Sequence, residues 1–189
     1  MARIVISSVL DHLLLKNEKI IVAIDGNCAS GKSTIASDIS NSYDCNIFHT
    51  DDFFLRPEQR TPERYNTPGG NVDYERFKEE VLDKIHLSNS FEYRRFDCKE
   101  MKLGESIRVN GKRLNIVEGV YSMHPDLTSM YDYKILMSID KNLQMDRIVF
   151  RNGKKFASIF ETKWIPLENR YFFDLNIWDQ ADLVLRINR

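Results

Sequence analysis

Residues 26–33 read Gly-Asn-Cys-Ala-Ser-Gly-Lys-Ser, which has the spacing G-x-x-x-x-G-K-[ST]. Gly26 and Gly31 permit backbone angles that a side chain would forbid, so the loop can turn its N–H groups inward around an anion. Lys32 would then reach the β and γ phosphates of ATP, and the Ser33 hydroxyl would ligate Mg²⁺. The residues of this predicted ATP-binding loop are Gly26, Asn27, Cys28, Ala29, Ser30, Gly31, Lys32, Ser33 and Thr34.

The segments on either side of this loop support the same interpretation. Residues 20–24 form a short apolar run, which is typical of a buried parallel strand. Ile35, Ala36 and Ile39 then lie on one face of a helix predicted over 32–42. A strand, a glycine loop and a helix in succession are the arrangement that a phosphate-binding loop requires.

Composition limits the classes of function. The 189 residues suffice for one domain, predicted to span 1–189, and the net charge of −1 does not favour binding to nucleic acid or to an anionic membrane. No apolar run is long enough to span a bilayer. The three cysteines form no C-x-x-C pair, which favours a reducing cytoplasm. Cys28 is interpreted as a small loop residue, with a redox switch as the alternative. A homo-oligomer is compatible with these features.

Apolar and amphipathic segments alternate along the chain, which predicts an α/β domain with a mostly parallel five-stranded sheet. Asn110-Gly111 has the signature of a two-residue hairpin turn, here within residues 107–114. Asp73 is a plausible cap for the helix that carries Phe77, Val81 and Ile85. Strands are expected at 20–25, 45–50, 91–96, 114–117, 133–139 and 181–187. Other helices are expected at 1–16 and around 143–148.

Acidic residues follow three of these strands. Asp51 and Asp52 come after strand 45–50, Glu118 after strand 114–117, and Asp140 after strand 133–139. Ligands of open α/β sheets bind at the carboxyl edge of the strands. One carboxylate of the Asp51–Asp52 pair could accept a proton from an attacking hydroxyl, whereas the alternative is a helix cap or a turn. The position of Glu118 after an apolar strand favours an acid directed toward Mg²⁺, and the alternative is a helix N-cap or an acid in a turn.

A basic segment follows the fifth predicted strand. Arg147, Arg151, Lys154 and Lys155 surround Asn152-Gly153. Such a segment could fold over a transferring phosphate, and arginine binds phosphate in a bidentate manner. The alternative is a solvated basic helix end. We therefore expect a helical lid at about 147–170, with Arg147 and Arg151 as its catalytic cations.

These motifs together resemble one family. I-D-G-x-x-x-S-G-K-S-T at 24–34, D-D-F-F-L at 51–55 and I-V-E-G at 116–119 are similar to segments of the uridine kinase and phosphoribulokinase group. The resemblance implies a P-loop three-layer sandwich, nucleoside-kinase-like, with a small hairpin insertion. It also implies that Asp51 is the catalytic base and that Glu118 lies with Mg²⁺ in the active site.

The resemblance further places an acceptor site, expected to consist of Asp52, Asp73, Phe96 and Asp97. Asp73 looks like the acid that contacts the acceptor's ribose in uridine kinases. Phe96-Asp97-Cys98 stands where those kinases carry Tyr-Asp-Phe followed by a histidine. The first expectation is a kinase of a uridine- or cytidine-like nucleoside. A sugar phosphate or a pantothenate-like acceptor is the alternative, and a nucleotide-binding regulatory protein is an alternative from another class.

Overall fold

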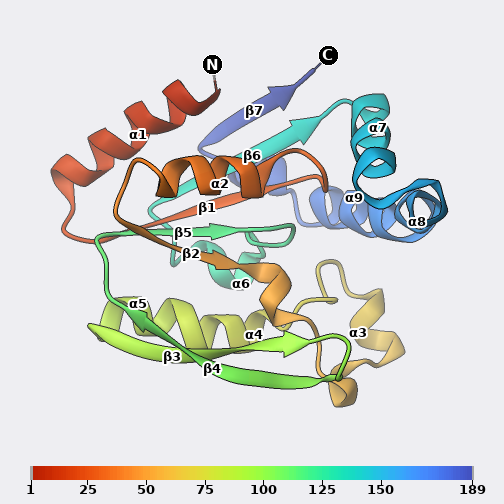
Figure 1. The fold of residues 1–189 in the computed structure, drawn as a ribbon, viewed down its shortest axis with the longest axis horizontal. Helices are drawn as coiled ribbons and strands as arrows, with labels where there is room; N and C mark the ends of the chain where they lie inside the picture. The colour runs from red at the N-terminus through yellow and green to blue at the C-terminus, as the bar shows by residue number, and fades with distance from the viewer. Residues whose placement is uncertain (1, 189) are drawn as a thin grey trace.

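Five parallel strands form the central sheet, in the order β2-β5-β1-β6-β7 (Figure 1). The structure is a computed structural model that describes residues 2–188. The strands are β1 Ile20–Gly26, β2 Cys45–His49, β5 Leu114–Glu118, β6 Tyr133–Ile139 and β7 Leu183–Ile187. The predicted parallel sheet is confirmed, and each of its strands lies within two residues of the expected bounds.

Helices pack on both faces of this sheet, so the domain has three layers (Figure 1). The helices are α1 Ala2–Lys16, α2 Lys32–Ser40, α3 Pro62–Asn66, α4 Tyr74–Phe77, α5 Asp83–Leu87, α6 Pro125–Thr128, α7 Lys141–Asn152, α8 Lys154–Ile159, α9 Ile165–Asp174 and α10 Ile177–Gln180. Single π-helical turns at Lys78–Leu82 and Phe160–Trp164 join α4 to α5 and α8 to α9. No helix within residues 2–188 is long and apolar enough to cross a bilayer.

The position of β1 at the centre of the sheet explains why its sequence is apolar from Ile20 to Ile24. Ile20, Val22 and Ile24 belong to the core that includes residues of α1 and α2. Ile21 and Ala23 point to the opposite face and belong to the core beneath α4, α5 and α9. Because successive side chains of a strand alternate between faces, a strand covered on both sides needs an apolar residue at every position.

The hairpin insertion exists, but its turn is not where the sequence pattern placed it. β3 (Ser90–Asp97) pairs antiparallel with β4 (Lys102–Asn110), so the turn lies at 98–101. Asn110-Gly111 instead leads the chain out of β4 toward β5, and the Gly111 N–H donates to the Asn89 carbonyl at 2.6 Å. A two-residue turn of the predicted kind needs positive φ at both positions, and neither residue has it.

All four predicted helices are present, including those after Asp73 and at 1–16. The Asp73 carboxylate accepts the Arg76 N–H at 3.2 Å and so caps α4, and Phe77, Val81 and Ile85 are buried in the helical segment that follows. The helix expected at 1–16 is α1, although Met1 lies outside the described residues.

Candidate active site

The phosphate loop joins β1 to α2 in the conformation that its glycines allow. Gly26 has a φ of 140°, and a Cβ at this position would lie 2.0 Å from the Met137 carbonyl oxygen. Gly31 has a φ of 103° and immediately precedes α2. Positive φ angles of this kind are costly for residues with a side chain. The motif therefore requires its two glycines for different reasons. Gly26 allows the loop backbone to pass close to β6, and Gly31 allows the backbone conformation at the start of α2.

Lys32 folds back onto its own loop. Its Nζ donates to the carbonyl oxygens of Gly26 at 2.8 Å and Asn27 at 3.0 Å, and only 7% of the residue is exposed. Carbonyl acceptors satisfy the ammonium group without neutralising it, so its charge remains available to an anion in the loop.

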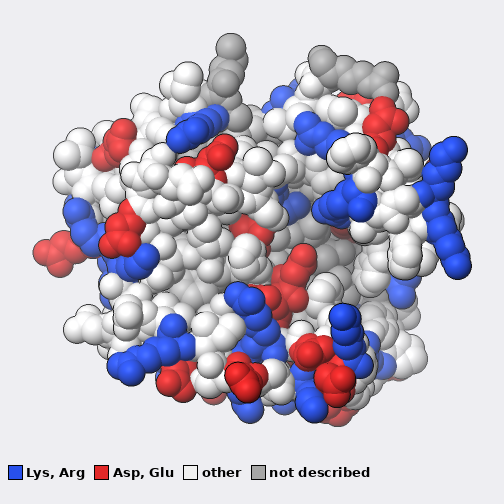
Figure 2. All heavy atoms as spheres, viewed as in Figure 1, with Lys and Arg blue, Asp and Glu red and all other residues white. Residues whose placement is uncertain are grey.

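A cavity of about 890 Å³ opens in front of this loop. Figure 2 shows the corresponding face of the molecule hollowed between the sheet and the layer below it, with acidic and basic side chains around the hollow. The predicted site residues that line the cavity are Cys28, Ala29, Ser30, Gly31, Lys32, Ser33, Thr34, Asp51, Glu118, Arg147 and Arg151. The volume is in the range of cavities that hold small-molecule ligands.

Asp51 begins the part of the site contributed by β2. It lies in a 3-10 turn, Thr50–Phe53, directly after that strand. The side chain reaches the cavity, but surrounding protein atoms partly desolvate it, and this raises the pKa of its carboxyl group. The negative charge of Glu118 raises that pKa further, whereas Lys32 lowers it. A carboxylate held in this way is a better proton acceptor than an ordinary aspartate.

Glu118 is paired with His49 at the end of the neighbouring strand β2. His49 Nδ1 lies 2.6 Å from Glu118 Oε1, because the two residues are register partners at the ends of β2 and β5. The hydrogen bond to Glu118 raises the pKa of His49. Glu118 is only 4% exposed, so this contact fixes the orientation of a buried carboxylate.

Asp52 points away from the cavity. Its Oδ2 lies 2.9 Å from Arg95 Nε of the hairpin strand β3. Burial raises the pKa of Asp52, and the charge of Arg95 opposes this effect. The structure therefore separates the two neighbouring aspartates, placing Asp51 on the cavity wall and Asp52 at the contact between the turn and the hairpin.

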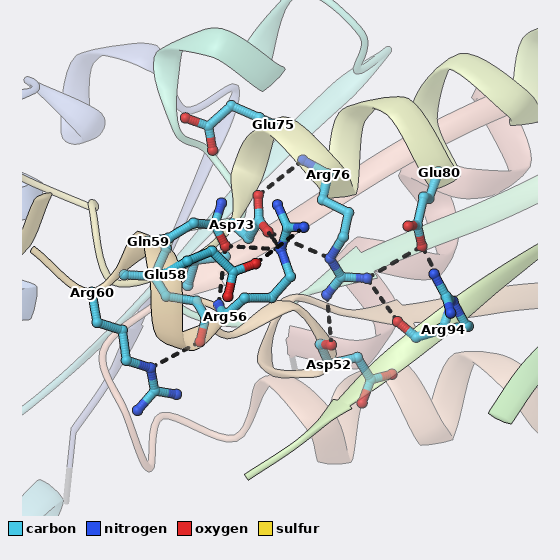
Figure 3. A network of polar contacts seen from close by, with 12 residues as sticks. Asp52, Arg56, Glu58, Gln59, Arg60, Asp73, Glu75, Arg76, Glu80 and Arg94 are labelled. Atoms are coloured by element: carbon cyan, nitrogen blue, oxygen red, sulfur yellow. Dashed lines mark hydrogen bonds and ion pairs between the residues drawn. The ribbon is translucent and has the colours of Figure 1, made fainter. Parts of the chain in front are cut away.

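Asp73 lies in a network of charged groups (Figure 3). Its Oδ2 is within 3.4 Å of Arg56 Nε and 3.5 Å of Arg76 Nε, and the residue is 1% exposed. Arg76 continues the network to the Asp52 carbonyl at 3.3 Å. In this arrangement Asp73 caps a helix and balances two guanidinium groups, and it does not line the cavity.

Phe96 and Asp97 also lie outside the cavity wall. The guanidinium of Arg60 covers the buried Phe96 ring at 5.5 Å from its centroid. Asp97 accepts the N–H groups of Lys99 at 2.8 Å and Glu100 at 3.1 Å, and these bonds lower the pKa of its carboxyl group. Asp97 therefore holds the hairpin turn together.

Both predicted lid arginines come from α7. Arg147 donates to the carbonyl oxygens of Ala29 at 3.0 Å and Ser30 at 3.4 Å in the phosphate loop. Arg151 donates to Asn152 Oδ1 and lies over the ring of Phe160. Asp140, at the start of the same helix, caps it by accepting the N–H of Asn142 at 3.0 Å.

Two buried acids of the site were not found by sequence analysis. Asp25 is fully buried at the end of β1, and its carboxylate accepts the Tyr171 hydroxyl at 2.7 Å. Glu168 of α9 lines the cavity and accepts the Cys28 N–H at 2.9 Å. An acid inside an apolar strand was the available signal for Asp25, whereas nothing in its neighbourhood marks Glu168. The cavity wall also contains Phe54, Asn71, Tyr121 and Trp164.

The oxygen donors in the cavity fit a magnesium ion that arrives with a nucleotide. Among residues 2–188, no three His, Cys, Asp or Glu side chains gather closely enough to hold a metal by themselves. Mg²⁺ is commonly held by one or two protein oxygens together with substrate phosphates and water. Ser33 and Glu118, which both line the cavity, can supply such oxygens.

Comparison with known proteins agrees with the motifs. No family model matches the chain. A protein named uridine kinase from Clostridium novyi (strain NT) is 29% identical over 146 residues, which cover 72% of this chain and 69% of the relative. Another of that name from Clostridium botulinum (strain Kyoto / Type A2) is 27% identical over 70% of this chain and 68% of its own length. The chain resembles the uridine kinases.

Solved structures show the same fold. The structure of a possible uridine kinase from Bacillus stearothermophilus matches with a TM-score of 0.67 and 17% identity, covering 94% of this chain and 96% of that one. A candidate fructose transport system kinase from Silicibacter sp. TM1040 matches with a TM-score of 0.73 and 18% identity, over 98% of each chain. The fold is that of the P-loop kinases, and the predicted fold class is confirmed.

Proposed function

We propose that this uridine kinase-like protein is an ATP-dependent kinase that transfers the γ-phosphate to a hydroxyl group of a small molecule, with a uridine- or cytidine-like nucleoside as the first candidate. The observation that carries the proposal is the convergence of Lys32, Ser33, Asp51 and Glu118 on one cavity. Phosphoryl transfer needs a phosphate cradle, a divalent cation and a group that orients the acceptor. These four side chains can supply the three functions.

The donor half of the site is the phosphate loop. Its N–H groups and Lys32 would bind the β and γ phosphates, and Ser33 with Glu118 would hold Mg²⁺. The ion supplies neutralisation of the charge that develops on the phosphate oxygens. His49 would keep Glu118 in the orientation for this role, since a hydrogen-bonded partner fixes a metal-binding carboxylate.

Asp51 is proposed as the base for the acceptor hydroxyl. The raised pKa of its carboxyl group improves proton acceptance. Because Asp51 lines the cavity, its side chain would face a bound acceptor. Arg147 and Arg151 are proposed to approach the transferred phosphate from the lid at about 147–170, where charge stabilisation is effective once water is excluded.

The rest of the cavity wall supports a nucleoside-like acceptor. Phe54, Tyr121 and Trp164 present aromatic side chains, and Asn71 adds an amide that can donate and accept hydrogen bonds. Aromatic rings and an amide suit a flat heterocycle with polar edges. The expected contacts of Asp52, Asp73, Phe96 and Asp97 with the acceptor remain proposals, and they require the cavity wall to open toward those residues.

The substitution Asp51→Asn tests the assignment. We expect phosphoryl transfer to fall by about 10²- to 10⁴-fold, because general base catalysis is lost. Binding of a non-hydrolysable ATP analogue should remain, since Asp51 does not belong to the phosphate loop. Asp44→Asn is the matched control, because Asp44 is 86% exposed at the opposite end of β2. Unchanged turnover in Asp51→Asn would refute the role of this residue.

The acceptor is identified by a substrate panel. Uridine, cytidine, a pentose phosphate and pantothenate are each supplied with ATP and Mg²⁺, and nucleotide consumption is followed. Turnover with the nucleosides supports the first candidate. Turnover only with the phosphosugar or pantothenate moves the acceptor to that class, and ATP binding without turnover on any acceptor favours a regulatory nucleotide-binding protein.

A further inference from the structure

Three parts of the chain meet at Cys28 of the phosphate loop. The Cys28 N–H donates to Glu168 Oε2 of α9 at 2.9 Å. Gln144 Nε2 of α7 donates to the Cys28 carbonyl at 3.1 Å and contacts its Sγ at 3.2 Å. Figure 1 shows α7 and α9 gathered at the end of the sheet where β1 turns into α2. Glu168 is 4% exposed and Gln144 is 3% exposed, so both contacts are buried.

The contact with Glu168 has an unusual chemical character. The N–H groups of a phosphate loop form a site for anions, and a carboxylate is an anion that accepts the same hydrogen bonds as a phosphate oxygen. Glu168 also lies within electrostatic reach of Lys32, whose charge lowers its pKa. The protein therefore places one of its own negative charges at the loop that is built for a nucleotide.

This carboxylate is held at an energetic cost. Burial raises the pKa of Glu168, so its charged form is less favourable in this position than in water. A triphosphate in the loop would bring further negative charge close to Glu168, and like charges in a poorly solvated site repel strongly. The contact of Glu168 with Cys28 and the binding of a triphosphate in the loop therefore oppose each other.

We propose that Glu168 takes the place of a phosphate oxygen on the Cys28 N–H, and that a nucleoside triphosphate displaces it and releases α9 from the loop. Glu168 is thus a positioning residue that links nucleotide occupancy to the placement of the segment carrying Arg147, Arg151 and Trp164. The inference rests on the proposed function only in requiring that the loop bind a triphosphate.

The first test uses the tryptophans of the chain, which are Trp164 and Trp178. Trp164 lines the cavity in the turn just before α9. In the variant Trp178→Phe, the fluorescence of Trp164 is measured while a non-hydrolysable ATP analogue with Mg²⁺ is added. We expect a saturable change in emission. Saturable binding of the analogue, measured by calorimetry, without any change in emission would overturn the proposal.

The second test removes the charge and keeps the shape. Glu168→Gln retains an oxygen for the Cys28 N–H but carries no negative charge, so the analogue should bind about tenfold more tightly, equivalent to about 1.4 kcal/mol. Glu161→Gln makes the same change at an exposed position of the same segment and should bind like the wild type. Equal or weaker binding by Glu168→Gln, relative to Glu161→Gln, would overturn the proposal.

The two proposals fail in different ways. If the wild type does not bind the analogue, the proposed nucleotide site is wrong and this inference falls with it. If the wild type binds but Glu168→Gln binds no more tightly, only the role of Glu168 is wrong. The Trp178→Phe measurement requires no change at Glu168, so an unchanged emission overturns the proposal whether or not Glu168→Gln folds.

Discussion

His49 Nδ1 lies 2.6 Å from Glu118 Oε1, and this hydrogen bond joins the ends of two adjacent parallel strands. It orients the carboxylate proposed to hold Mg²⁺. Removing it in His49→Ala should raise the Mg²⁺ concentration needed for half-maximal turnover by about 10- to 100-fold, the usual effect of losing a partner of a metal-binding group. Initial rates over a magnesium titration at fixed ATP would measure this shift.

His49→Asn should recover part of the loss, because its amide nitrogen can approach the position of Nδ1. His12→Ala, on the exposed side of α1, is the control for removing an imidazole elsewhere. An unchanged magnesium requirement in His49→Ala would assign the contact with Glu118 to stability alone.

Features set by neighbouring residues were predicted well from the sequence. The phosphate loop, its flanking strand and helix, and the acids that end β2 and β5 depend on patterns within a few residues. The hydrogen bond between His49 and Glu118 does not, because it requires that β2 and β5 be adjacent and in one particular register. Asn110-Gly111 was misassigned for a related reason. The strand β4, which ends at Asn110, pairs with the preceding strand β3, and the residues around 110–111 do not reveal this pairing.

The acceptor site shows the limit of motif resemblance. Asp73 and Asp97 fit the family pattern by position, yet their carboxylates are engaged by Arg56 and by the hairpin turn. Glu168 contacts a residue 140 positions earlier in the chain, and no local pattern reports such a contact. Local motifs therefore predicted the loop residues and the strand-end acids that line the cavity, while tertiary packing determines most of the rest.

Gly119 should be intolerant of any side chain. Its φ is 140°, and a Cβ would lie 1.9 Å from Thr50 Oγ1, beside Asp51. Gly119→Ala should therefore lower the free energy of unfolding by about 2–4 kcal/mol through backbone strain and steric overlap. Urea denaturation would measure the loss. Gly104→Ala is the matched control, because the nearest atom to its Cβ is 3.4 Å away, and a similar loss there would contradict this explanation.

Cys28 should be a poor nucleophile although it lies in the phosphate loop. Burial, followed by the charge of Glu168, raises the pKa of its thiol to about 12. At pH 8 only about one Cys28 in ten thousand would be a thiolate, the form that reacts with alkylating agents. Mass spectrometry after a timed iodoacetamide reaction should find the exposed Cys98 modified well before Cys28. Equal rates at the two sites would favour the redox-switch alternative.

Asp25 should make stability depend on pH. Burial raises its folded pKa above the ordinary value of 3.8, even though it accepts hydrogen bonds from Gly26, Met123 and Tyr171. Between the unfolded and folded pKa values the folded protein holds a proton that the unfolded chain has lost. The contribution of Asp25 to stability therefore falls as the pH rises through that window.

Tyr171→Phe tests this account, because the Tyr171 hydroxyl stabilises the charged form of Asp25 and so lowers its pKa. Removing it should cost about 1–3 kcal/mol of unfolding free energy at a pH above the folded pKa of Asp25, where the carboxylate is left without one of its donors. The cost should be smaller at a pH below that pKa, where Asp25 is protonated. Urea denaturation at both pH values measures the difference, and Tyr65→Phe on the exposed helix α3 serves as the control. An equal cost at the two pH values would mean that Asp25 keeps the same charge throughout, contrary to the effect of its burial.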